Sequence, residues 1–132
     1  MKLILGALLF LPALGRAAQM PKTPFSTLKT AERFTLGKAG FAGTISTEEK
    51  ALRTLLREKK AGDQFAAILS SGTQAGQLYA LLGLKLLNDV RFDKAYPGYA
   101  ASKNSVSTME GCLVEDASVK AIVRGIRSGK YK

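Results

Sequence analysis

Carboxylates are the main candidates for acid-base chemistry in this sequence, because its 132 residues include no histidine. That absence excludes Ser-His and Cys-His nucleophiles and every histidine-containing metal site. Two adjacent pairs, Glu48 with Glu49 and Glu115 with Asp116, have the residue types of paired catalytic carboxylates. Both pairs lie at predicted helix starts, where capping and the helix dipole already explain acidic residues. Glu110 lies in an apolar segment without that explanation, and burial there would raise its pKa.

Cys112 is the only cysteine, so the chain can form no internal disulfide, zinc cluster or iron–sulfur site. Its mostly apolar neighbours predict a small buried core residue, and pairing with another chain remains open. Three glycines in residues 37–43 lack the sequence pattern of a phosphate-binding loop. The sequence therefore predicts no cofactor, no bound metal and no enzyme, with a carboxylate-only enzyme based on Glu110 as a remote alternative.

Basic side chains outnumber acidic ones by 20 to 10, which gives a net charge of +10. They gather in two groups that we expect to form one positive face, suited to lipid headgroups or acidic envelope polymers. A basic, solvated surface that keeps the protein soluble is the favoured interpretation of this charge, and an anion-binding face is the alternative. Specific nucleic-acid binding is not expected, because only Tyr131 lies near these groups and the chain has no tryptophan for base stacking. The candidate anion-binding residues are Lys50, Arg53, Arg57 and Lys60 in the first group and Lys120, Arg124 and Arg127 in the second, with Lys59, Lys130 and Lys132 beside them.

Residues 1–17 are typical of a secretory signal peptide. Lys2 supplies a positive charge, residues 3–14 are apolar apart from glycine and proline, and small residues lead to a cleavage site after Ala17. The run is too short to span a bilayer, which needs about 20 apolar residues, and no later run is longer. We expect an exported protein, periplasmic or secreted, with no transmembrane span in the mature chain; a buried apolar N-terminal helix is the alternative.

The rest of the chain is the size of one domain, and the mean hydropathy of +0.03 is that of a globular protein. Prolines and glycines predict an extended or weakly ordered segment over residues 18–45, with an irregular loop or short hairpin near its end. A helical domain is predicted over residues 46–132. Its first helix should start at Ser46, because Ser46 and Glu49 match a capping box, and should end near Gly62.

Two further helices are predicted, one capped by Asp63 and ending at Gly72, the other capped by Thr73 and running to about Leu87. Leucines surround the axis of the latter helix, so it should be central to the fold. Gly76 and Gly83 lie on one of its faces and are interpreted as close-packing positions.

A short helical turn should follow and stop at Pro97 and Gly98. Residues 106–114 fit a buried strand or the start of a helix equally well. A final amphipathic helix, capped by Asp116 or Ser118, should close at Gly129.

Together these elements predict a mainly α-helical, small single-domain bundle. The pattern allows a HEAT-like helix pair, although no second copy of the pair recurs. The predicted function is binding, in the envelope or secreted fraction, with an unknown protein or an anionic envelope component as partner.

Overall fold

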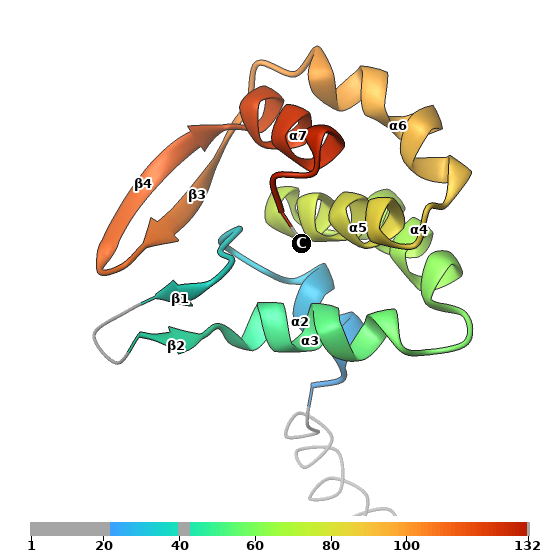
Figure 1. The fold of residues 1–132 in the computed structure, drawn as a ribbon, viewed down its shortest axis with the longest axis horizontal. Coiled ribbons are helices and arrows are strands. Elements are labelled where there is room, and N and C mark those ends of the chain that lie inside the picture. The colour runs from blue at the N-terminus through green and yellow to red at the C-terminus, as the bar shows by residue number, and fades with distance from the viewer. Residues whose placement is uncertain (1–21, 40–42, 132) are drawn as a thin grey trace, which may run out of the picture.

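The computed structural model describes residues 22–39 and 43–131, so the predicted signal peptide over residues 1–17 lies outside the described residues. Within that part the chain forms helices and two small antiparallel sheets (Figure 1). The mainly α-helical, single-domain prediction is confirmed. In chain order the elements are α2 (Pro24–Lys29), β1 (Lys38–Ala39), β2 (Thr44–Ile45), α3 (Thr47–Leu56), α4 (Ala61–Ser71), α5 (Gln74–Leu86), α6 (Val90–Ala100), β3 (Ser105–Glu110), β4 (Leu113–Ser118) and α7 (Val119–Ser128).

Helix α5 is the centre of the fold, as its leucine-rich sequence predicts. The Thr73 hydroxyl caps it by accepting a hydrogen bond from the Gly76 N–H at 3.1 Å. Helices α2, α3, α4, α6 and α7 all contact α5, and α7 and α3 lie on opposite sides of it (Figure 1). A helix surrounded in this way must be apolar on every face. Its buried residues are Ala75, Gly76, Leu78, Tyr79, Ala80, Leu81, Leu82, Gly83 and Leu84.

The two glycines of α5 are close-packing positions, as predicted. A Cβ at Gly76 would overlap the backbone carbonyl oxygen of Leu28, and a Cβ at Gly83 would overlap the buried ring of Phe65. Each glycine therefore lowers the helix propensity of α5, but it allows a neighbouring element to approach closely.

The segment before Ser46 belongs to the core, so the prediction of an extended, weakly ordered segment is wrong for its helical first part. The short hairpin predicted near its end is confirmed, because β1 pairs antiparallel with β2. Residues Pro24–Lys29 form helix α2, with the Thr23 hydroxyl as its N-cap and Pro24 at its first position. Leu28 and Phe34 are fully or almost fully buried. Pro24 was misinterpreted, because proline is favoured in the first turn of a helix and disrupts only later ones.

Helix α3 starts as predicted, but the helix after it does not. The Ser46 hydroxyl accepts a hydrogen bond from the Glu49 N–H at 3.0 Å. The Glu49 carboxylate does not complete a capping box; it accepts from the Gly37 N–H at 2.6 Å and so anchors the preceding loop. Helix α3 ends at Leu56, so the predicted end near Gly62 is wrong, and Gly62 lies in α4, which begins at Ala61.

Asp63 lies in the first turn of α4 and is not its cap, because the N-cap position is held by Lys60, whose side chain makes no capping bond. The Asp63 carboxylate instead pairs with Arg91 at 2.9 Å. Gly72 ends α4 as predicted.

Helix α6 continues through Pro97, contrary to the predicted short turn. Proline removes one helical N–H, but the next turn still closes because the Ala101 N–H donates to the Pro97 carbonyl at 3.2 Å. Tertiary contacts hold this last turn: the Tyr99 hydroxyl bonds Gln77 of α5 at 2.6 Å, and the Arg127 guanidinium of α7 lies over the Tyr96 ring at 4.7 Å.

Residues 105–118 form a hairpin of β3 and β4, which resolves the open choice between strand and helix. Glu110 pairs with Leu113, so Gly111 and Cys112 form a two-residue loop. Gly111 has φ +59°, as the tight hairpin turns of this length require. Ser118 then caps α7, and Gly129 ends it in the left-handed conformation, both as predicted.

Candidate binding surfaces

The β3–β4 hairpin extends away from the helical body (Figure 1). Every side chain of β4 except that of Ala117 is exposed. Two large apolar side chains are among these, with Leu113 59% exposed and Val114 45% exposed. Met109 lies directly opposite Val114 on β3. Met109 and Val114 therefore share one face of the hairpin, and Leu113 projects from the other. Neighbouring apolar side chains are typical of a contact surface, whereas single ones are ordinary.

Cys112 lies at the tip of this hairpin and is exposed, so the prediction of a buried core cysteine is wrong. The apolar sequence neighbours of Cys112 do not indicate burial here, because a two-residue loop directs its side chains to solvent whatever their character.

Glu110, the acid left unexplained by the sequence, is exposed at the end of β3. It shares one hairpin face with Glu115, and both line a groove of about 340 Å³ beneath the hairpin. Sequence reasoning missed this pairing, since only the strand register places the two carboxylates on the same face.

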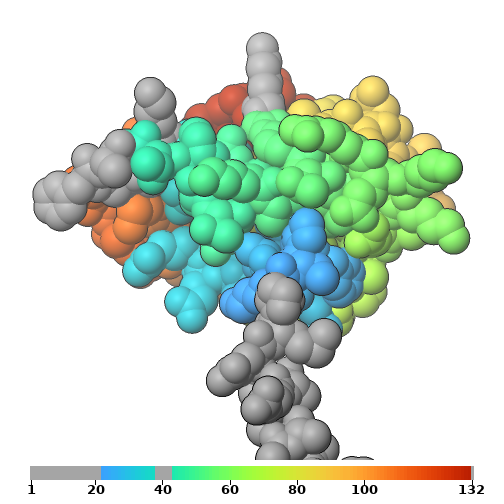
Figure 2. All heavy atoms as spheres, turned by 90° about the horizontal axis from the view of Figure 1, so that it is seen from below, coloured from blue at the N-terminus to red at the C-terminus, as the bar shows by residue number. Residues whose placement is uncertain are grey.

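The two basic groups do not form one face, so that expectation is wrong. Helix α3 buries Leu52 and Leu55 toward the interior, and α7 buries Val123 and Ile126. These helices flank α5 from opposite sides, and their outer faces point away from each other (Figure 1). Figure 2 shows the side covered by α3, with α7 at its far edge.

The outer face of α7 carries three exposed cations, Lys120, Arg124 and Arg127. None of them has an acidic partner within residues 22–39 and 43–131. The Arg127 guanidinium lies over the ring of Tyr96 at 4.7 Å, which fixes its position beside α6. Arg124 lies directly opposite the buried stripe of the helix.

The α3 group is partly neutralised. Arg53 pairs with Glu49 one turn earlier at 3.4 Å, as neighbours on a helix face do. Lys50, Arg57 and Lys60 are exposed. This side of the molecule is therefore a second cationic surface, separate from that of α7.

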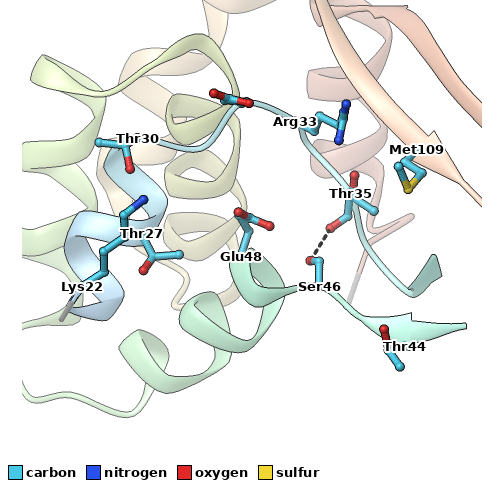
Figure 3. Close-up of a pocket in the computed structure, with 10 residues that line it drawn as sticks. Lys22, Thr27, Thr30, Arg33, Thr35, Thr44, Ser46, Glu48 and Met109 are labelled. Carbon is cyan, nitrogen blue, oxygen red and sulfur yellow. Dashed lines mark hydrogen bonds between the residues drawn. The ribbon is translucent and has the colours of Figure 1, made fainter. Parts of the chain in front are cut away.

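A polar cavity of about 460 Å³ lies between α2, the start of α3 and the hairpin (Figure 3). The Ser46 hydroxyl donates to the Thr35 carbonyl in its wall at 3.5 Å. The side-chain hydroxyls of Thr27 and Thr35 have no hydrogen-bond partner in the part of the chain that the structure describes. The cavity can therefore offer hydrogen bonds and both signs of charge to a polar solute. It is lined by Lys22, Thr27, Thr30, Glu32, Arg33, Thr35, Thr44, Ser46, Glu48 and Met109.

Sequence reasoning missed this cavity because its walls come from three separate elements. The only local signal was the density of threonine around Pro24.

Among the described residues there is no group of three acidic or cysteine side chains that could hold a metal ion. No helix in the same residues is long and apolar enough to cross a membrane. The chain matches no family model, and no curated protein or solved structure is similar to it.

Proposed function

We propose that this chain is an exported, non-enzymatic binding protein that contacts a protein partner through the β3–β4 hairpin. The observation that supports it is the exposure of Leu113 and Val114, one on each face of a hairpin that projects from a well-packed helical body. The apolar stretch of residues 3–14 supports export. Fully burying an exposed side chain of this kind is worth about 1.5–3 kcal/mol, so covering the exposed half of Leu113 and of Val114 contributes roughly half of that each.

The single cysteine provides the test, because Cys112 is exposed at the hairpin tip and can carry a photo-crosslinker. We expect irradiation in an extracytoplasmic extract to give one adduct of defined mass. An adduct should still form when salt is raised well above about 0.1 M, because apolar contacts persist where charge contacts are screened.

A matched pair of double variants decides whether the apolar hairpin residues are responsible. Replacing both Leu113 and Val114 with serine should abolish the adduct. Replacing Leu87 and Val90, the other two exposed large apolar residues of the described chain, should leave it intact. Equal adduct yields from the two double variants would contradict the proposal.

A second candidate function, binding to anionic membranes or polymers, is favoured by the cations on α7 that lack acidic partners. Each such residue contributes about 1 kcal/mol near an anionic membrane. Reversing Lys120 and Arg124 to glutamate should therefore weaken binding to phosphatidylglycerol vesicles at least 30-fold, by about 2 kcal/mol. Arg127 is left in place because it packs on Tyr96. Vesicle binding that is insensitive to salt would exclude this function.

A further inference from the structure

Strand β4 has a free outer edge. A two-residue loop makes Glu110 and Leu113 a hydrogen-bonded pair, and such pairs alternate along an antiparallel ladder. The backbones of Leu113, Glu115 and Ala117 therefore bond to β3. The N–H and C=O groups of Val114 and Asp116 point the other way.

These outward groups have no backbone partner in residues 22–39 and 43–131. The opposite edge of the hairpin is already in use at its start, where the Phe34 N–H donates to the Ser107 carbonyl at 2.9 Å. Figure 1 shows β4 on the outside of the hairpin and β3 on the side of the body. The free edge is thus on the accessible side.

Charge limits what can pair with this edge. Glu115 projects from one face of β4 and Asp116 from the other, on a chain whose net charge is otherwise strongly positive. A second copy pairing antiparallel would bring these carboxylates opposite or diagonal to their own copies, which is destabilising. An acidic strand is disfavoured for the same reason, whereas adjacent basic residues on a partner strand would be attracted to both carboxylates.

We propose that β4 accepts an extended segment of a partner protein as an added strand, and that two adjacent basic residues of that segment lie opposite Glu115 and Asp116. The backbone groups of Val114 and Asp116 supply the main-chain hydrogen bonds, and the carboxylates select the sequence. The exposed apolar side chains of Leu113 and Val114 add contact area on both faces. This proposal rests on the proposed function and specifies its binding mode.

The test uses the full chain and a synthetic eight-residue peptide with two central lysines flanked by valine and threonine. Amide hydrogen exchange of Val114 and Asp116 should slow on the order of tenfold when the peptide is present at saturation. Exchange at Glu115, whose amide already bonds to β3, should not change. A peptide with two central glutamates should not bind.

Two variants separate the edge from the rest of the hairpin. Val114→Pro removes an outward N–H without removing a ladder bond, since proline is tolerated on an edge strand in that orientation. Asp116→Lys keeps every backbone group and reverses one charge. Each variant should bind the lysine peptide on the order of tenfold more weakly. Unchanged exchange rates of the ladder amides in Asp116→Lys would show that the hairpin remains folded.

Three results would overturn strand addition: no binding of the lysine peptide at millimolar concentration, equal binding of the glutamate peptide, or a dimer of this chain that protects the same two amides. Loss of the Cys112 adduct in the Leu113 and Val114 double variant would still support the hairpin as the binding surface. The failure of strand addition is therefore distinguishable from the failure of the proposed function.

Discussion

Two helical glycines, Gly83 and Gly98, differ in the space around them. Gly83 in α5 faces the ring of Phe65, which is fully buried. Gly98 in α6 is exposed, and a Cβ there would meet nothing within 4 Å. The same substitution should therefore change stability in opposite directions at the two sites.

We expect Gly83→Ala to destabilise the protein by about 1–3 kcal/mol, because overpacking exceeds the gain in helix propensity. Gly98→Ala should stabilise it by about 0.5–1 kcal/mol. Urea denaturation of both variants measures the difference. A stabilised Gly83→Ala protein would mean that the Phe65 ring can shift.

Tyr79 joins the central helix to the segment before Ser46. Its hydroxyl donates to the Thr35 carbonyl and accepts from the Thr35 N–H, both at 2.8 Å. Burial raises the pKa of Tyr79 above its ordinary value of 10.0. The folded state therefore favours the neutral phenol, and stability should fall as the pH rises above 10, where an unfolded tyrosine ionises.

Tyr79→Phe should cost about 1–3 kcal/mol at neutral pH, because it leaves the Thr35 N–H unpaired and leaves the Thr35 carbonyl with only the longer bond from Ser46. The variant should also lose less stability than the wild type between neutral pH and pH values above 10. Urea denaturation across this pH range tests both expectations. A parallel decline in the two proteins would show that Tyr79 does not control alkaline unfolding.

At the level of elements, an ion-pair cluster ties the start of α6 to the start of α4. Arg91 pairs with Asp89 at 2.7 Å and with Asp63 at 2.9 Å. A Cβ at Gly62 would lie 2.6 Å from both the Arg91 guanidinium and the Asp89 carboxylate, so glycine makes room for the cluster. The sequence signals of α4 and α6 gave no hint of this link, because its members lie 28 residues apart in the chain.

Hydrogen bonds from Arg91 lower the pKa of Asp89 to about 2. The stabilisation from this carboxylate is complete above the ordinary value of 3.8 and is lost as the pH falls through about 2. Asp89→Asn keeps the helix cap, because asparagine caps as well as aspartate. We expect its melting temperature to lie a few degrees below that of the wild type at neutral pH. The difference should shrink as the pH falls below 3.8 and vanish only below about pH 2; a constant difference would assign the effect to capping geometry.

At the scale of the whole molecule, the two cationic surfaces face in opposite directions. A protein of this shape that binds anionic vesicles should also link them to one another. We expect turbidity when it is added to phosphatidylglycerol vesicles at low salt. Reversing Lys50 and Arg57 on α3, or Lys120 and Arg124 on α7, should abolish turbidity while one side still binds. Turbidity that survives in both double variants would mean that other cations carry the association.

The amino-acid sequence by itself determined the helical character, the central position of α5 and several helix ends. Ser46, Thr73 and Gly129 act within one turn of the backbone, so their effect is readable locally. Pro24 and Pro97 were misinterpreted because the same residue begins one helix and is tolerated in another, where Tyr96 and Tyr99 hold the last turn.

Only the tertiary structure decided where the candidate binding residues lie. Helical periodicity gives each basic residue a face, but the side of α5 on which α3 or α7 packs depends on contacts distant in sequence. Strand register likewise placed Cys112 in solvent and left Val114 and Asp116 with outward backbone groups. A pairing register is a property of two segments together, and no single stretch of residues encodes it.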